Sequence, residues 1–143
     1  MNQLHVDLGI EEFAFGGGVL RFNPSDPNLY ARFLALPQDL EALQKQLEKG
    51  MAEAVTGAGV LAQLEETDRR FKTLLTQVFG KENDFSRLLE GVNLLAVNGT
   101  GETVAENLLA ALEPVLKQGA ERFVQTQTQA AVEKARQRRE NQC

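Results

Sequence analysis

Apolar and polar residues alternate with a helical period from Val60 to Gly80, the longest unbroken pattern of the chain. Apolar side chains recur three and four positions apart, as in an amphipathic helix with one buried face. Gly80 lacks a Cβ and suits the left-handed conformation in which helices often end. We predict a helix here and place the rest of the chain around it. Its apolar positions are Leu61, Leu64, Phe71, Leu74, Leu75 and Val78, and its polar positions are Glu65, Glu66, Asp68, Arg69, Arg70 and Lys72.

A period of two residues predicts short strands at the start of the chain. The glycines from Gly16 to Gly18 can adopt positive φ and close a hairpin. A phosphate-binding loop is the alternative for these glycines, and it is disfavoured because no Lys-Ser or Lys-Thr pair follows them. We predict two or three antiparallel strands, with His5 on the surface of the first. The alternating apolar residues are Leu4, Val6 and Leu8, then Phe13 and Phe15, then Val19, Leu20 and Phe22.

A helix is predicted to begin at Pro27, which fits the first helical position and follows side chains that can cap it. Its apolar stripe is expected to turn inward. Pro37 cannot donate a backbone hydrogen bond, so we predict a break or kink there. A second segment, Gln38 to Lys49, should then end at Gly50. The predicted stripe is Leu29, Phe33 and Leu36, with Tyr30 and Leu34 beside it.

The middle of the chain contains weaker signals. Gly57 and Gly59 predict a poor helix or a connection before the Val60–Gly80 helix, because each glycine costs about 1 kcal/mol in a helix interior. Asn83 or Asp84 is expected to cap a short helical piece with inward Phe85, Leu88 and Leu89. Residues 91–101 predict a buried irregular linker that turns at Asn98-Gly99.

The second strongest helical stripe follows Thr103. Thr103 and Glu106 form a capping-box pattern at its start. Pro114 removes one backbone hydrogen bond and predicts a kink near residues 110–113. We expect this helix to pack on the Val60–Gly80 helix. Its apolar residues are Val104, Leu108, Leu109, Leu112, Val115 and Leu116.

Together these patterns predict a mainly α (α+β) fold, a helical bundle with a small N-terminal antiparallel β-hairpin or three-stranded sheet. The 143 residues, 43% of them apolar, can bury one core. We predict a single domain over residues 1–125. Residues 126–143 are polar and basic, and we expect them to form a projecting helix end or a disordered tail.

Charge and cysteine content narrow the function classes. The net charge is −5, which argues against general nucleic-acid binding. Four cations and Glu140 give the segment after Glu133 a charge of +3, which suits either a solvated helix end or contact with an acidic partner. The single cysteine, Cys143, excludes an intrachain disulfide and a multi-cysteine metal site. The chain shows no signal peptide and no membrane-spanning run, so we expect a cytosolic protein.

Catalytic chemistry is not predicted. Ser25 and Ser86, the only serines, stand where helix caps are expected, and His5 is the only histidine. The adjacent pairs Glu11-Glu12 and Glu65-Glu66 have side chains that diverge on a strand or helix. We therefore expect no enzyme, and no catalytic, cofactor-binding or metal-binding residue.

A resemblance extends over roughly residues 19 to 123. The chain resembles the tail assembly chaperones of long-tailed bacteriophages, particularly small proteins encoded in prophages of Gram-positive bacteria. It departs from that pattern at residues 89–91, where the family often has a second Phe-Gly. The residues that carry the resemblance are Leu20-Arg21-Phe22-Asn23-Pro24-Ser25-Asp26, then Asp68, Phe71, Leu75, Val78, Phe79 and Gly80, then Gly91-Val92-Asn93-Leu94-Leu95-Ala96-Val97-Asn98, and finally Val104, Glu106-Asn107-Leu108-Leu109, Ala111-Leu112 and Pro114.

The resemblance implies a non-enzymatic protein of the bacterial host cytoplasm. Such a protein binds the tape measure protein and keeps it soluble until the tail tube polymerises around it. The tail tube protein and a second copy of the chain are further candidate partners, whereas a membrane is not. We expect the binding groove between the Val60–Gly80 helix and the helix after Thr103. The expected partner-binding residues are Leu108, Leu112, Phe123, Val124, Lys134, Arg136, Arg138 and Arg139.

Two alternatives come from other function classes. A structural component of the virion, such as a head-tail connector or minor tail protein, would persist in purified particles, whereas a chaperone would be missing from them. A small regulatory protein could instead use the basic tail on nucleic acid, and its binding would then collapse with added salt. We rank this last because the rest of the chain is acidic.

Overall fold

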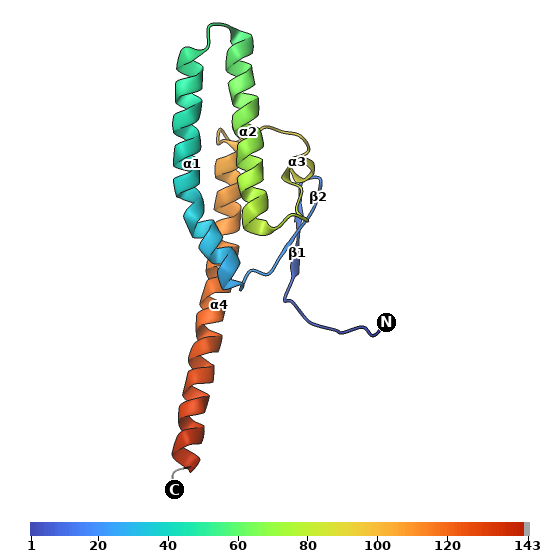
Figure 1. The fold of residues 1–143 in the computed structure, drawn as a ribbon, viewed down its shortest axis with the longest axis vertical. Helices are drawn as coiled ribbons and strands as arrows, with labels where there is room; N and C mark the ends of the chain where they lie inside the picture. Colours follow the sequence, from blue (N-terminus) through green and yellow to red (C-terminus); the bar gives the residue numbers. More distant parts are fainter. Residues whose placement is uncertain (142–143) are drawn as a thin grey trace.

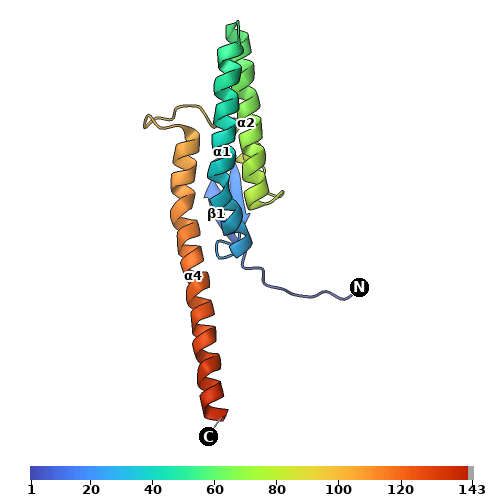
Figure 2. The ribbon, with the colours of Figure 1, turned by 60° about the vertical axis from the view of Figure 1, so that its left-hand side comes forward.

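The computed structural model describes residues 1–141. Helices α1 and α2 form a long antiparallel hairpin, the two strands lie beside its base, and α4 runs along α1 and continues past the body (Figures 1 and 2). This arrangement confirms a mainly α fold with an N-terminal β-hairpin. The elements are β1 (Glu11–Phe15), β2 (Gly18–Phe22), α1 (Pro27–Glu53), α2 (Gly57–Phe79), α3 (Phe85–Leu88) and α4 (Val104–Asn141).

The β-hairpin contains two antiparallel strands in which Phe13 pairs with Leu20. Gly16 has a φ of 46° in the connecting turn, as its lack of a Cβ allows. Phe13 stacks on Phe22 with ring centroids 4.9 Å apart, which turns one face of the hairpin toward the core. The third predicted strand is absent from the described chain, because residues 1–10, including His5, lie outside any helix or strand.

Helix α1 begins as predicted, since the Asp26 carboxylate accepts the Asn28 N–H at 2.9 Å. Of the break or kink predicted at Pro37, the break is wrong, and so is the predicted stop at Gly50, because α1 is one helix of 27 residues. Figure 1 shows that it bends instead of breaking. A proline removes one hydrogen bond, and packing along α2 outweighs that loss.

Helix α2 begins three residues earlier than its apolar pattern predicts. The Thr56 hydroxyl accepts the Gly59 N–H at 3.0 Å, so both glycines of this region lie in the first helical turn. The helix ends before Gly80 as predicted, but with a φ of 111° and a ψ of 152° this glycine lies outside the left-handed helical conformation. Arg32 of α1 donates two hydrogen bonds, of 2.9 and 3.1 Å, to the Val78 carbonyl near this end, which ties the two helices together.

Two residues predicted on the polar face of α2 are mostly buried. Lys72 forms an ion pair with Asp68 at 2.8 Å and donates to the Val92 carbonyl at 3.1 Å. Asp68 also accepts the Leu94 N–H at 2.8 Å. Their position among charged residues predicted exposure, but the irregular segment 91–98 folds over this side of α2 and buries Leu94 completely.

Asn83 is a second buried polar residue, and it connects the hairpin to the end of α2. Its side chain accepts the Arg21 N–H at 2.9 Å and donates to the carbonyls of Arg21 and Phe79 at 2.8 and 3.0 Å. Asp84, the other predicted cap, accepts the Ser86 N–H at 3.0 Å and begins α3. The side-chain amide of Asn83 thus completes the hydrogen bonding of the outer edge of β2 at Arg21.

Helix α4 starts at the predicted cap, where the Thr103 hydroxyl accepts the Glu106 N–H at 3.1 Å, and passes Pro114 as one helix. Its closest helical neighbour is α1, not α2 as predicted; Figure 2 shows α1 between them. The hairpin partner and the segment 91–98 already cover α2. Residues 126–141 are helical and exposed, and Cys143 lies outside the described residues.

Candidate partner-binding groove

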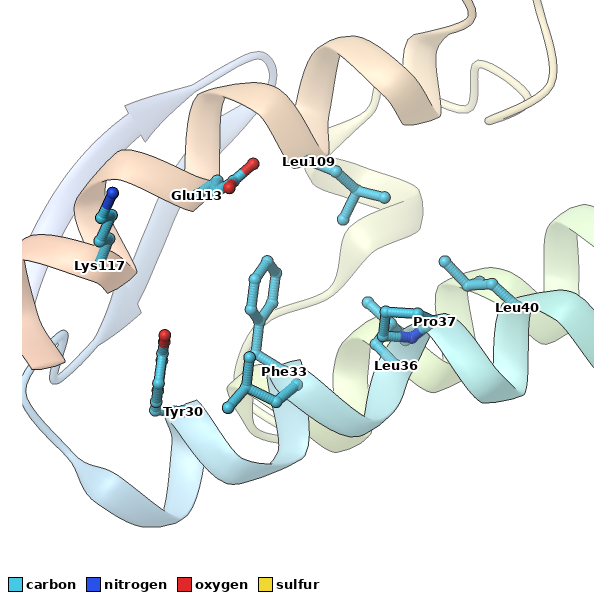
Figure 3. A pocket seen from close by; sticks show the side chains of 9 residues that line it. Tyr30, Phe33, Leu36, Pro37, Leu40, Leu109, Glu113 and Lys117 are labelled. Carbon is cyan, nitrogen blue, oxygen red and sulfur yellow. The ribbon is translucent and has the colours of Figure 1, made fainter.

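An apolar groove of about 480 Å³ lies between α1 and α4. Figure 3 shows side chains of both helices pointing into it. Its floor and walls are mostly carbon, so it suits a ligand with apolar side chains. The lining residues are Tyr30, Phe33, Leu34, Leu36, Pro37 and Leu40 of α1, with Leu109, Glu113 and Lys117 of α4.

The groove exists because α1 has two apolar rows. The first row, Leu29, Leu36 and Leu43, repeats every seven residues and is buried in the core. The second row contains Phe33 and Leu40, which are only half-buried because they face α4 across the groove. Helix α4 covers part of this second row and leaves the rest open.

Pro37 lines the groove from the middle of α1 (Figure 3). Its ring has no N–H, so the carbonyl of Phe33, one turn earlier, loses its usual helical donor. The residue therefore adds apolar surface to the groove. That surface favours a protein ligand with an apolar stripe.

The groove has a polar end formed by Tyr30, Glu113 and Lys117 (Figure 3). Glu113 and Lys117 stand one helical turn apart on α4, yet neither forms an ion pair with another residue among 1–141. One carboxylate and one ammonium group are thus available to charged side chains of a bound helix, and they would fix its direction and register.

A second hollow of about 490 Å³ continues from this polar end along α4. It shares Tyr30 and Lys117 with the first hollow and reaches Val124. The two hollows together form one track from Leu40 of α1 to the start of the projecting part of α4. We call this track, from Leu40 to Gln125, the α1–α4 groove.

The structure separates the expected partner-binding residues into three groups. Leu108 and Leu112 are buried in the core, so they offer almost no surface to a partner. Phe123 is half-buried, and Val124 is exposed and lines the α1–α4 groove. The four cations, Lys134, Arg136, Arg138 and Arg139, lie on the projecting end of α4, and Arg136 donates to Glu133 at 3.0 Å.

The groove also lies elsewhere than expected, since it runs between α1 and α4 and not beside the Val60–Gly80 helix. Sequence reasoning missed Leu40, Pro37 and Leu109 as lining residues. A signal for them was present: Tyr30 and Leu34 widen the apolar stripe of α1 beyond what one buried face needs. A helix with such a wide stripe meets two neighbours, or one neighbour and a ligand.

The described residues 1–141 contain no group of three His, Cys, Asp or Glu side chains that could hold a metal ion. Within the same residues, no helix is long and apolar enough to cross a membrane. On α2, a hydrogen bond from Arg70 and the charge of Arg69 lower the pKa of Glu66. That cluster is a surface ion network and not an acid–base pair in a pocket.

Comparison with protein-family models, curated proteins and solved structures returned no match for this chain.

Proposed function

We propose that this protein is a phage tail assembly chaperone that acts in the bacterial cytoplasm and binds the tape measure protein until the tail tube polymerises. The observation that carries the proposal is the open α1–α4 groove, whose apolar lining comes from two long helices. An amphipathic helix can lay its apolar face into such a groove. A tape measure protein is a long helical chain with apolar stripes that need cover before assembly.

The dimensions of the groove favour reversible binding. Burial of a leucine or phenylalanine side chain contributes about 1.5–3 kcal/mol, and the groove has room for only a few such side chains. Association costs at least about 4 kcal/mol of lost freedom. The free energy from burying a few side chains exceeds this association cost only slightly, so each groove binds its partner weakly. Many copies could then cover a long partner and still leave when the tube subunits arrive.

Co-expression with a tape measure protein from the same genome tests the proposal. The tape measure protein should become soluble and co-purify with the wild-type chain. Leu34→Asp should abolish both effects, because Leu34 is 60% exposed and lines the groove. Leu61→Asp is the matched control, since Leu61 is also a helical leucine, is 62% exposed and lies outside the groove.

Two outcomes would contradict the proposal. One is a tape measure protein that stays insoluble or fails to co-purify with wild type. The other is equal capture by the Leu34→Asp and Leu61→Asp variants, both of which should remain folded because neither residue is in the core. Mass spectrometry of purified particles adds an independent check, because a chaperone should be absent from them and a structural component present.

A further inference from the structure

Residues 1–10 carry a strand-like alternation that the chain's own sheet does not use. Leu4, Val6, Leu8 and Ile10 occupy the even positions, and all four side chains are exposed. Polar residues and Gly9 occupy the odd positions from 3 to 9. A period of two with one apolar row is typical of a strand that covers a sheet or core on one face. Figure 1 shows this segment leading away from the body.

The segment is out of phase with the strand that follows it. β1 turns its odd residues Phe13 and Phe15 toward the core, whereas the apolar row of residues 4–10 is even. A one-residue change of phase moves every side chain to the other face, so the segment cannot extend β1 and bury its apolar row on the core side.

Local hydrogen bonds turn the segment away from β1. Gly9 has a φ of 68°, and its N–H donates to the Asp7 carboxylate at 2.8 Å. The Asn23 side chain donates to the Leu8 carbonyl at 2.9 Å, which holds the segment beside the end of β2. Pairing of residues 4–10 with any strand requires the Gly9 N–H to leave the Asp7 carboxylate, so the segment pairs only where new strand hydrogen bonds replace this one.

The sheet nevertheless has an open edge. Arg21 of β2 pairs with Glu12 of β1, and both backbone groups of Arg21 bond outward to Asn83. In an antiparallel pair, the backbone groups of Glu12 must then point away from β2, as must those of Ala14 two residues on. No strand of residues 1–141 pairs with this edge. Unpaired edge groups readily accept another strand.

We infer that residues 4–10 of one copy pair as a strand with the outer edge of β1 in a second copy. With Leu8 opposite Phe13 and Val6 opposite Phe15, antiparallel pairing continues the apolar row of the core face. Asp7 then falls opposite Ala14, not opposite a glutamate.

A second copy fits better than a foreign chain for two reasons. One chain contains both the unused strand and the unused edge. In addition, this pairing places Gly9 opposite Glu12 and Ile10 opposite Glu11, so the two glutamates of β1 meet no anion of the second copy. This surface shares no residue with the α1–α4 groove, and the inference does not rest on the proposed function.

Sedimentation velocity over a concentration series tests this pairing. Wild type should self-associate, and Val6→Lys should weaken the association at least about tenfold because it places a charge in the apolar row. Val132→Lys is the matched control, since Val132 is 64% and Val6 71% exposed. It should behave as wild type. Amide exchange of Glu12 and Ala14 should slow as wild type associates and stay fast in Val6→Lys.

Three results would overturn the inference. Wild type could stay monomeric at concentrations on the order of 100 μM. Val6→Lys could associate as strongly as wild type. Alternatively, Val132→Lys could weaken the association as much as Val6→Lys does, which would place the contact on α4. Circular dichroism checks that both variants are folded, as expected for substitutions at exposed side chains.

Discussion

Gly119 is the residue at which α4 passes closest to the loop before α1. A Cβ at this position would overlap the carbonyl oxygen of Pro24 and approach the N–H of Ser25. Backbone atoms cannot give way as a flexible side chain can, so only glycine lets the helix approach this closely. By helix propensity alone, Gly119 should destabilise α4. The close approach of the Pro24 backbone nevertheless requires a residue without a Cβ at this position.

Gly119→Ala should therefore destabilise the protein although alanine is the better helix former. We expect the free energy of unfolding to fall by about 1–3 kcal/mol through overpacking, measured by urea denaturation. Gly57→Ala is the control, because nothing lies within 4 Å of a Cβ there. It should leave stability unchanged or raise it by up to about 1 kcal/mol. A stable Gly119→Ala protein would show that α4 can shift away from the loop.

At the scale of elements, one polar pair of α2 positions a segment that has no regular structure. Asp68 and Lys72 together hold the backbone of residues 92 and 94 through one hydrogen bond each. Leu94 is thereby fixed in the core, where its carbonyl accepts the Ala105 N–H of α4 at 2.9 Å. The side chains of Asp68 and Lys72 thus form hydrogen bonds with the backbone of the irregular segment, as a neighbouring strand would in a sheet.

Asp68→Ala should lower the free energy of unfolding by about 2–4 kcal/mol, because it leaves the Lys72 ammonium buried without its partner and the Leu94 N–H without an acceptor. Glu66→Ala is the control: it also removes an acid with cationic neighbours from α2, but the Glu66 network is exposed and should matter little. Chemical denaturation measures both. Equal effects would mean that segment 91–98 does not depend on Asp68.

The sequence predicts the elements well where one local rule acts. The glycines at 16–18 close the hairpin, Thr103 and Asp84 cap helices, and Gly80 ends α2. Prediction fails where distant packing decides. Pro37 does not break α1, because the packing of α1 along α2 outweighs the one hydrogen bond that the proline removes.

Failures at the candidate site have the same origin. The apolar stripe after Thr103 shows that a helix buries Leu108 and Leu112, but it does not show which helix they meet. The groove depends on α4 packing against α1, and that choice depends on the loop 91–98 and on Gly119. Neither is visible as a period in the sequence. The apolar row of residues 4–10 predicts a strand, and in a single copy it has no sheet to join.

At the scale of the whole molecule, the first part of α4 packs against the body, whereas its last part projects beyond it (Figure 1). Residues 126–141 are exposed along their whole length, and their side chains form bonds such as that from Arg136 to Glu133 only one turn away. Nothing in this region contacts the core. The body and the projecting helix are therefore expected to unfold independently.

Truncation after Gln129 should leave the cooperative thermal unfolding of the body unchanged. The helical circular dichroism signal per molecule should fall, because the removed residues are helical. Differential scanning calorimetry measures the first effect and far-ultraviolet circular dichroism the second. A lower melting temperature in the truncated chain would show that the projection stabilises the body, and a truncation before Gly119 provides the destabilised comparison.

The straight projection of α4 also separates opposite charges. Residues 134–141 carry four cations and one anion, and the helix holds the four cations roughly 14 to 21 Å beyond Gln125 at 1.5 Å per residue. In cellular salt, electrostatic fields fade over roughly 8 Å. The acidic body therefore cannot mask the far end of the rod. An approaching anionic surface would meet a locally positive tip on a molecule whose total charge is negative.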